Sequence, residues 1–575
     1  MQEAIGRTAG AKAQTLAQLL VAIDRYDPTT GRYRRSDHNR ISAARTVIVD
    51  ECSMLTEDAL DALLDGVEGF DRLILVGDPR QLPPIGVGRP FVDIVTYLRD
   101  QCGTLAVPRV GASYAELTVP RRQVTTGSSF ERSDLAFAEW FAGEVPSPGA
   151  DEVWDLLGRE DLPTIAFRQW NSAEDLHETL RDELLRGLPL MSSRDDADGF
   201  QLSCGATRVG NHHYFNIGAA KTAEEWQVLS PVRASAGGIA ELNRLLQKSY
   251  RQGALDLARP TDPRWRKIPK PAGPDEIVYG DKVMNIKNGK RTHYFPSSPD
   301  VIEYVANGEI GVVTGPFRGK GKHVPLDRLE VEFSTQPGTA YKFWFRELGG
   351  DDGSSLLELA YAITVHKSQG SEFGRTFVVI PSPCRLLSRE LLYTALTRQR
   401  EHVTVLYQGP LTDLKKYASA GFSETSARLT NLFHAPAPVE FDGRFLESAL
   451  VHKTRKGILV RSKSELIIAD LLYSKNIEFE YERPFVAPDG SWRSPDFTIV
   501  DDTTGTTIYW EHLGMLARPS YRRKWIAKQA WYASHGVLPE TESGGPSGTL
   551  VTTEDGVDGS ISSNAIEQLV DRLFG

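Results

Sequence analysis

Cysteine is scarce in this chain, and long apolar runs are absent. Four cysteines (Cys52, Cys102, Cys204 and Cys384) occur among 575 residues, without paired spacing. Isolated cysteines indicate neither a zinc site nor a disulfide framework, so a reducing cytoplasmic compartment is expected. No apolar run approaches the ~20 residues of a membrane-spanning helix, and the amino terminus does not resemble a signal peptide. We therefore expect no membrane association.

A strong charge of one sign is also lacking. The 66 Lys and Arg residues are outnumbered by 76 Asp and Glu residues, which gives a formal net charge of −10. This balance argues against a protein that coats nucleic acid through general positive charge. It leaves room for a local basic groove, because phosphate contacts depend on nearby Lys and Arg. The length predicts three or four domains.

Two short apolar runs end in polar residues of the kind found at nucleotide sites. Residues 47–49 precede Asp50 and Glu51, and residues 73–76 precede a proline-rich loop that contains Gln81. Each run is predicted to be a parallel strand buried on both faces. Since ligands sit beyond the carboxyl ends of such strands, the acids can serve Mg²⁺ and water, and Gln81 a γ-phosphate. An isolated Asp-Glu pair would more simply open a surface loop.

Further motifs follow in a fixed order along the chain. They are Leu-Thr-Val-Pro-Arg-Arg-Gln at 117–123, Thr-Val-His-Lys-Ser-Gln-Gly at 364–370 and Tyr-Thr-Ala-Leu-Thr-Arg at 393–398. Together the motifs resemble the superfamily 1 DNA helicases, most closely the RecD-like branch, over about residues 1 to 410. The resemblance implies ATP and Mg²⁺ as cofactors, DNA as the partner, and two RecA-like domains that clasp the nucleotide.

The resemblance also assigns roles to individual residues. The residues it implies for nucleotide binding and hydrolysis are Asp50 (Mg²⁺ ligand), Glu51, Gln81, Arg122, Gly370, Glu372 and Arg398. Those it implies for contact with single-stranded DNA are Thr364, His366 and Ser368. His366 on its own would be a loop histidine with no task, and only its place in the motif favours contact with DNA.

The phosphate loop of these helicases, Gly-x-x-x-x-Gly-Lys-Ser/Thr, is missing from the sequence. Residues 7–16 resemble the helicase segment that follows this loop. Because the loop supplies backbone N–H groups and a lysine to the phosphates, ATP hydrolysis by the chain as given is expected to be weak. Three explanations stay open: a mis-called start or split gene, a partner chain that completes the fold, or a degenerate motor that only binds DNA. A missing first strand also predicts an exposed sheet edge.

Two other regions of the motor have patterns of their own. Ser172 is predicted to cap an amphipathic helix that carries Leu176, Leu180 and Leu184. Residues 277–346 contain short β-rich runs separated by Gly-Asp, Asn-Gly and Gly-Pro turns. This segment resembles the SH3-like barrel inserted in the second RecA-like domain of RecD-like helicases, where it faces DNA.

A new unit is predicted after the Ala-Pro-Ala-Pro stretch at 435–438. Glu465 lies in the first turn of a predicted apolar helix, Asp496 at the entrance of a predicted strand, and Glu511 in the next strand. A hairpin would bring Asp496 and Glu511 together, and Glu465 can approach from the helix. Three converging carboxylates would suit Mg²⁺ or Mn²⁺. The Gly-, Ser- and Thr-rich stretch 540–559 predicts a loop.

These pieces resemble the core of the PD-(D/E)XK nucleases. The resemblance implies that Asp496 and Glu511 bind metal and that Glu465 is the helix glutamate. The lysine usually found two residues after the glutamate is Leu513 here. Lys528, on the following predicted helix, is our candidate for the missing ammonium. A structural hairpin without metal remains the alternative.

The overall prediction is an α/β protein with two RecA-like parallel-sheet domains, a small SH3-like β-barrel insertion and a smaller α/β nuclease-like domain. The expected ranges are 1–155 (first RecA-like domain), 156–276 and 347–430 (second), 277–346 (insertion) and 442–575 (nuclease-like). The expected function is an ATP-dependent DNA helicase or translocase fused to a metal-dependent DNA nuclease, acting in DNA processing, repair or defence. Its DNA would be single-stranded or carry single-stranded ends. The alternatives are a non-catalytic DNA-binding or assembly subunit, or a nuclease alone.

Overall fold

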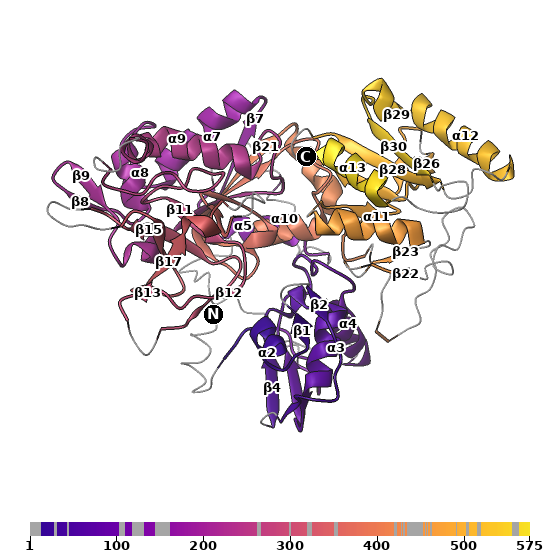
Figure 1. Ribbon diagram of the computed structural model, residues 1–575, viewed down its shortest axis with the longest axis horizontal. Helices are drawn as coiled ribbons and strands as arrows, with labels where there is room; N and C mark the ends of the chain where they lie inside the picture. The colour runs from indigo at the N-terminus through magenta and orange to yellow at the C-terminus, as the bar shows by residue number, and fades with distance from the viewer. Residues whose placement is uncertain are drawn as a thin grey trace. The chain divides into compact units, whose positions relative to one another are not determined.

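The computed structural model divides the chain into two compact units, which are described separately (Figure 1). The first unit comprises Met1–Leu19, Val76–Pro83 and Leu98–Ala427, and the second comprises Leu20–Leu75, Pro84–Tyr97 and Arg428–Gly575. The structure describes residues 13–574 except 28–30, 43–44, 103–109, 118–131, 144–153, 155–161, 261–265, 298–300, 319–324, 350–354, 419–421, 427, 429–431, 434–451, 455, 457, 461–462, 476, 490, 502–504, 514–518 and 555–562. No helix within the described ranges has the length and apolar composition needed to cross a membrane.

A five-stranded sheet in which all neighbouring strands are parallel forms the centre of the first unit. Its order is β19-β10-β20-β21-β7, so the predicted parallel-sheet domain is confirmed. The strands are apolar and buried on both faces because helices cover the sheet; α7 packs on β7 and β21, and α9 packs on β19. The bounds are β7 (Ile165–Trp170), β10 (Trp226–Ser230), β19 (Ala362–Thr364), β20 (Phe373–Ile380), β21 (Gln399–Gln408), α7 (Ala173–Gly187), α8 (Ala197–Ser203), α9 (Ile239–Ala258) and α10 (Arg389–Ala395).

The cap predicted for α7 is present. The Ser172 hydroxyl accepts a hydrogen bond from the backbone N–H of Asp175 at 3.2 Å. Leu176, Leu180 and Leu184 are fully buried, as their helical spacing predicts. This helix covers the edge of the parallel sheet.

The insertion forms a six-stranded antiparallel sheet with the order β13-β17-β16-β15-β11-β18. It extends to Leu359, beyond the predicted limit at 346, because β18 pairs with β11. No pairing between the end strands β13 and β18 closes a barrel in the described ranges. The bounds are β11 (Lys282–Asn285), β13 (Tyr294–Phe295), β15 (Ile310–Gly315), β16 (Arg328–Phe333), β17 (Ala340–Trp344) and β18 (Leu357–Leu359).

Buried charged groups join this insertion to the parallel-sheet domain. Lys282 donates to the Trp226 carbonyl at 2.7 Å, and its ammonium lies 4.6 Å from the centre of the Trp226 ring. Asp281 accepts from Tyr361 at 2.9 Å and pairs with Arg251. Since buried charges cost free energy unless they are paired or hydrogen-bonded, these contacts hold the two sheets in a fixed arrangement.

In the second unit, β4 (Thr46–Val49) and β6 (Arg72–Leu75) pair in parallel, with Val49 opposite Leu75. The predicted burial on both faces is wrong: Ile48 is 66% exposed, and Ile74 also reaches the surface. The reason is that the sheet has two strands in the described ranges, so no second layer covers both faces. The pairing nevertheless brings the carboxyl ends of the two strands to one edge.

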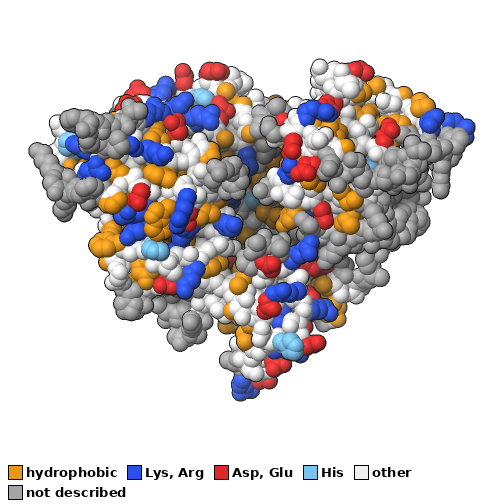
Figure 2. All heavy atoms as spheres, in the orientation of Figure 1, with side chains coloured by type: hydrophobic (Ala, Val, Ile, Leu, Met, Phe, Trp, Pro, Cys, Tyr) orange, Lys and Arg blue, Asp and Glu red, His pale blue; other side chains and the backbone are white. Residues whose placement is uncertain are grey.

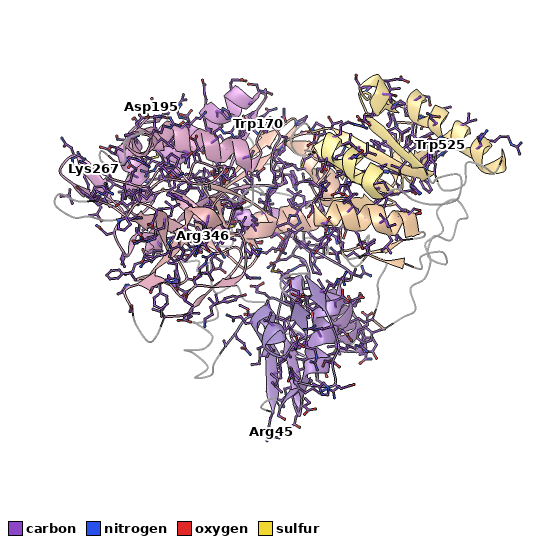
Figure 3. The ribbon with its side chains drawn as sticks, in the orientation of Figure 1. Arg45, Trp170, Asp195, Lys267, Arg346 and Trp525 are labelled. Atoms are coloured by element: carbon purple, nitrogen blue, oxygen red, sulfur yellow. The ribbon has the colours of Figure 1, made fainter. Side chains whose placement is uncertain are left out.

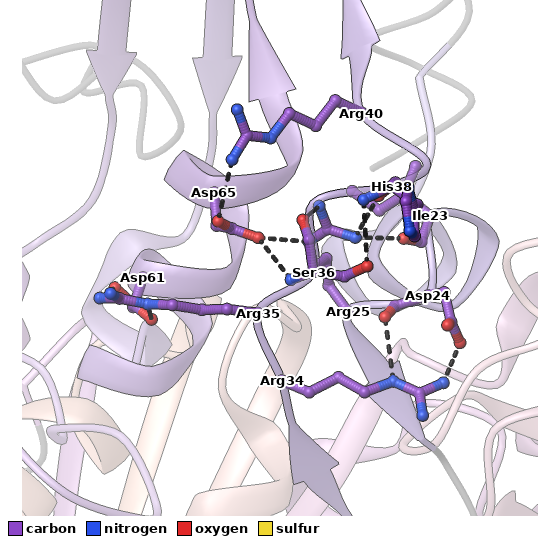
Figure 4. A network of polar contacts seen from close by, with 10 residues as sticks. All are labelled: Ile23, Asp24, Arg25, Arg34, Arg35, Ser36, His38, Arg40, Asp61 and Asp65. Atoms are coloured by element: carbon purple, nitrogen blue, oxygen red, sulfur yellow. Dashed lines mark hydrogen bonds and ion pairs between the residues drawn. The ribbon is translucent and has the colours of Figure 1, made fainter.

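A buried arginine organises the segment before β4. Arg25 is fully buried; it pairs with Asp65 at 2.6 Å and donates to the carbonyls of Ile23 and His38 at 2.9 Å (Figure 4). Asp65 also accepts from the Ser36 backbone N–H at 3.1 Å. These contacts tie the β1–β2 hairpin to α3 (Glu57–Gly66).

The carboxyl-terminal part of the second unit is a mixed five-stranded sheet with the order β24-β27-β28-β30-β29. The loop predicted for 540–559 is wrong, because Gly548–Glu554 forms β30 and pairs in parallel with β28. Buried Leu550 and Val551 explain the strand, since packing overrides the polar composition around them. The bounds are β24 (Glu480–Tyr481), β27 (Phe497–Val500), β28 (Thr507–Leu513), β29 (Val537–Pro539), α11 (Lys463–Ser474), α12 (Pro519–Ser534) and α13 (Ser563–Phe574).

The remaining elements are short or peripheral. They are α2 (Leu16–Ala22), α4 (Pro90–Cys102), α5 (Ser133–Glu139), β1 (Tyr26–Asp27), β2 (Arg32–Tyr33), β3 (Ile41–Ser42), β5 (Val67–Glu68), β8 (Thr207–Val209), β9 (His212–Tyr214), β12 (Gly289–Lys290), β14 (Tyr304–Val305), β22 (His452–Lys453), β23 (Leu459–Val460), β25 (Phe485–Val486) and β26 (Trp492–Arg493).

Candidate functional site

The predicted hairpin brings Asp496 and Glu511 together in the second unit. Strands β27 and β28 are antiparallel, with Phe497 opposite Trp510, so the residue before Phe497 faces the residue after Trp510. The backbone N–H of His512 donates to Asp496 Oδ2 at 2.5 Å. The two carboxylates therefore lie side by side on neighbouring strands.

Lys528 reaches this pair from α12, as proposed from the sequence. Its Nζ lies 2.5 Å from Glu511 Oε1 and donates to the Ser494 carbonyl at 2.8 Å. The hydroxyl of Tyr532 donates to the same Glu511 oxygen at 2.8 Å. Sequence reasoning missed Tyr532, although it follows Lys528 by one helical turn and so shares its face of α12.

Glu465 approaches from α11 and is held by a second tyrosine. The Tyr481 hydroxyl donates to Glu465 Oε2 at 2.5 Å. Burial raises the pKa of Asp496 well above its usual range, and the neighbouring charges of Glu511 and Glu465 add to this effect, while Lys528 opposes it. Burial also raises the pKa of Glu511, against the lowering effect of Lys528. Glu511, Glu465 and Lys528 thus all act electrostatically on Asp496.

The three-carboxylate metal cluster expected from the sequence is not formed as such. Among the described residues, no group of three or more His, Cys, Asp or Glu side chains is arranged to hold a metal ion. Asp496 Oδ1 and Glu511 Oε2 take part in none of the hydrogen bonds or ion pairs found there. Asp496 Oδ1 and Glu511 Oε2 therefore fit a divalent cation bound through two protein carboxylates. Glu465 is hydrogen-bonded to Tyr481 instead.

The outer face of α12 is basic. Arg522 and Arg523 are exposed, and Figure 2 shows Lys and Arg side chains gathered over this end of the helix. Trp525, labelled in Figure 3, lies half-buried between these arginines and Lys528 along the helix. The sequence Pro519–Ser534 contains no acidic residue, in a chain of net charge −10.

Asp50 and Glu51 directly follow β4, as predicted. The backbone N–H of Glu51 donates to Asp50 Oδ1 at 2.9 Å. Glu51 has a φ of 56°, in the left-handed region, and begins the short helix Cys52–Met54. A non-glycine residue with positive φ is uncommon and often marks a functional position.

The loop Val76–Pro83, which follows β6, is held within the first unit by α10. The Tyr393 hydroxyl donates to Asp78 Oδ2 at 2.9 Å, and Arg80 both pairs with Asp78 at 2.9 Å and lies 5.2 Å from the Tyr393 ring centre. Burial raises the pKa of Tyr393, and the Asp78 charge adds to the effect. Gln81 Oε1 is buried and has no hydrogen-bond partner among the described residues. Sequence reasoning missed the role of Tyr393.

Arg398 follows α10 and is 6% exposed. Its guanidinium donates to the carbonyls of Thr394 at 3.1 Å and Ser371 at 3.4 Å. Gly370, with a φ of 75°, and Glu372 lie in the same loop as Ser371. The structure therefore brings these predicted nucleotide-site residues together, whereas Arg122 lies outside the described residues.

Two of the three residues expected to contact DNA are buried. Ser368 is fully buried and donates to the Val365 carbonyl at 2.7 Å, and Thr364 is 8% exposed. The Ser368 hydroxyl thus bonds within the turn, and Thr364 Oγ1 accepts from the Lys367 backbone N–H at 3.4 Å, so DNA contact by these two residues stays a prediction. His366 is half-buried. Gln369, in the same loop, donates to the Leu82 carbonyl at 2.9 Å and so links this loop to Val76–Pro83.

Comparison with known families supports the helicase resemblance. Residues 1–107 match the AAA domain, and residues 359–406 match the UvrD-like helicase C-terminal domain.

Curated relatives of the chain include RecD proteins. The RecBCD enzyme subunit RecD of Haemophilus influenzae is 49% identical over 414 residues, which cover 68% of this chain and 55% of the relative. The ATP-dependent RecD2 DNA helicase of Deinococcus radiodurans is 26% identical over 402 residues, 69% of this chain and 40% of the relative. The uncharacterized protein MJ1519 of Methanocaldococcus jannaschii is 25% identical over 526 residues, 87% of this chain and 39% of the relative. The chain thus spans between 39% and 55% of the length of these relatives.

A solved structure is also similar. The crystal structure of the Pif1 helicase from Bacteroides in complex with ADP-AlF3 and ssDNA has 15% sequence identity and a TM-score of 0.30. The match covers 73% of this chain and 86% of that chain.

Proposed function

We propose that this chain works as an ATP-dependent DNA helicase or translocase of the RecD-like type, joined to a metal-dependent deoxyribonuclease. The observation that carries the nuclease half is the convergence of Asp496, Glu511 and Lys528 in the second unit. The helicase half is supported by the helicase-domain match and by the RecD relatives. Because some of those relatives are by name subunits of the RecBCD enzyme, the proposal includes a partner polypeptide as well as single-stranded DNA.

In the motor, each nucleotide-site residue has a distinct proposed task. Asp50 would bind the Mg²⁺ that accompanies ATP, Glu51 would polarise the attacking water, and Gln81 would contact the γ-phosphate. The unpartnered Oε1 of Gln81 supports this assignment. A buried amide oxygen without a hydrogen-bond donor destabilises the folded protein, and a ligand that supplies the donor removes this cost. Arg398 and Arg122 would neutralise phosphate charge, with Gly370 and Glu372 beside the nucleotide.

Two contacts support coupling between nucleotide and DNA within the first unit. The Tyr393–Asp78 hydrogen bond ties the Gln81 loop to the helix that precedes Arg398. The Gln369–Leu82 hydrogen bond ties the same loop to the segment that carries His366. A movement of the Gln81 loop would thus be transmitted to the proposed DNA-binding loop.

In the nuclease, Asp496 and Glu511 would hold Mg²⁺ or Mn²⁺, and Lys528 would supply positive charge beside the scissile phosphate. A bound divalent cation activates water and stabilises the pentacovalent phosphate in reactions of this class. Lys528 lowers the pKa of Glu511 against the raising effect of burial, and the His512 N–H and the Tyr532 hydroxyl orient the two carboxylates.

The nuclease half is tested by cleavage of a labelled single-stranded oligonucleotide in the presence of Mg²⁺. Asp496→Asn and Glu511→Gln are each expected to lower the rate by at least about 100-fold, because each removes a charged metal ligand. Asp489→Asn changes a surface carboxylate of the same domain that pairs with His535, and it should leave the rate unchanged. Cleavage that survives both of the first two substitutions rules out this centre.

The motor half is tested by ATP hydrolysis with and without single-stranded DNA. DNA-stimulated hydrolysis that is lost in Glu51→Gln supports an active motor. DNA binding without any hydrolysis supports the second candidate, a non-catalytic DNA-binding or assembly subunit. The exposed apolar side chains of Ile48 on β4 and Ile74 on β6 favour this candidate, because a partner protein could cover them. Hydrolysis that Glu51→Gln leaves unchanged contradicts the proposed site.

A further inference from the structure

Two cations emerge at equivalent positions from paired strands of the first unit. Strands β10 and β19 are parallel neighbours, with Ser230 opposite Thr364 at their carboxyl ends. Arg233 lies three residues beyond the first strand and Lys367 three residues beyond the second. Because the carboxyl edge of a parallel sheet is where ligands bind, both cations face the ligand side of the sheet.

One carboxylate of the insertion forms ion pairs with both cations. Glu358, on β18, forms an ion pair with Lys367 through Oε1 and a second with Arg233 through Oε2, the latter at 3.2 Å. Arg233 is 53% exposed, whereas Glu358 and Lys367 are largely shielded from solvent. Burial lowers the pKa of Lys367, and the charge of Glu358 opposes this effect.

A turn of the insertion touches the same loop. Gly308 has a φ of 90°, and a Cβ at this position would lie 4.0 Å from the Lys367 carbonyl oxygen. A turn of the insertion therefore lies close to the Lys367 loop, in addition to the ion pair made by Glu358. A second acid, Asp275, lies near Glu358 and accepts from the Leu359 backbone N–H at 3.1 Å.

We propose that Lys367 and Arg233 form a phosphate-binding pair for the single strand, and that Glu358 is the resident counter-charge that a backbone phosphate displaces. This inference rests on the proposed DNA-binding function of the first unit. A phosphate that replaces Glu358 regains the two charge-assisted bonds that the carboxylate now makes to Lys367 and Arg233. The insertion would thereby set the affinity of the motor for DNA, because its own carboxylate competes with the strand.

The test measures binding of a fluorescent oligothymidine to the full chain over a range of NaCl concentrations. Glu358→Gln keeps the shape but removes the charge, so binding at low salt should tighten by severalfold. The slope of log K against log salt should steepen by about 0.7 for each cation that becomes available to phosphate. Asp195→Asn removes a different surface ion pair, with Arg181, and should change neither quantity.

A double substitution separates charge competition from a loss of packing. Adding Lys367→Met to Glu358→Gln should cancel the gain in affinity and return the slope towards that of the wild-type chain. Tighter, steeper binding by Glu358→Gln that Lys367→Met reverses establishes the proposal. An unchanged or weaker slope for Glu358→Gln, with normal wild-type binding, overturns this inference alone. If the wild-type chain does not bind the oligonucleotide, both this inference and the proposed DNA-binding function fail.

Discussion

Lys528 Nζ lies 2.5 Å from Glu511 Oε1, although the two residues come from different elements, α12 and β28. The position where a PD-(D/E)XK nuclease would carry its lysine holds Leu513, which is buried. Helix α12 thus places the ammonium of Lys528 beside the Glu511 carboxylate, for which β28 itself provides no positive charge. Burial raises the pKa of Glu511 and Lys528 lowers it, so removal of Lys528 affects the ionisation of the site as well as its charge.

Lys528→Met is therefore expected to reduce DNA cleavage by on the order of 100-fold, a loss typical for a single charge-stabilising group. Lys528→Arg keeps the charge and should recover part of the rate. The measurement is single-turnover cleavage at saturating Mg²⁺, with thermal unfolding as the control for folding. Equal activity of Lys528→Met and the wild-type chain would leave Lys528 with a structural role only.

Divalent cations should stabilise the second unit. Two adjacent carboxylates repel each other, and a cation that binds between them removes this repulsion. A ligand that binds only the folded state raises the free energy of unfolding by mass action. We expect Mn²⁺ and Mg²⁺ to raise the melting temperature of the wild-type chain but not that of Asp496→Asn. Ca²⁺ should stabilise without supporting cleavage. Identical cation effects on both proteins would place the binding elsewhere.

The proposed DNA-binding loop, residues 364–370, should contain both residues that contact DNA and residues that only hold the loop. His366→Ala should weaken oligonucleotide binding more than it lowers the melting temperature, because the imidazole is only half-buried and follows β19 by two residues. Ser368→Ala should instead lower stability by about 1 kcal/mol, since it removes a buried hydrogen bond to Val365. Fluorescence anisotropy and thermal unfolding distinguish the two effects. A loss of affinity in Ser368→Ala with unchanged stability would contradict the buried geometry.

Lys282 should give the first unit a distinctive pH dependence. Burial lowers the pKa of this lysine to about 8 in the folded state. Between this value and the ordinary pKa of ~10.4, the unfolded chain binds more protons, so stability rises with pH. The wild-type chain should therefore gain ~1–3 kcal/mol relative to Lys282→Met as pH rises from about 7.5 to 10. Denaturant unfolding followed by tryptophan fluorescence measures this difference. If the free energy of unfolding changes with pH in the same way for both proteins, burial does not lower the pKa of Lys282.

Local patterns were sufficient for several parts of the structure. The spacing of Leu176, Leu180 and Leu184 and the cap at Ser172 predicted α7, because helix period and capping depend on neighbouring residues only. Apolar runs bounded by acidic residues predicted that Asp50 follows a strand, which is β4, and that a hairpin brings Asp496 close to Glu511.

Other features depended on contacts between distant segments. The strand β30 lies in a polar stretch, and its pairing with β28 is what makes it a strand. The burial of β4 was predicted wrongly for the same kind of reason, since the exposure of a strand depends on the layers that cover it. Tyr481, on β24 beside Glu465, carries no signal in a single sequence, and Tyr532, beside Glu511, carries only its helical spacing from Lys528.

The sequence by itself determined which residues carry charge, which stretches alternate with helical or strand periodicity, and in what order the motifs occur, because these are properties of neighbours along the chain. Only the tertiary structure decided that Lys528 pairs with Glu511, that Ser368 faces inward, and that Glu358 pairs with both Arg233 and Lys367. The physical reason is that ion pairing and burial are set by distances between side chains that folding brings together from separate elements.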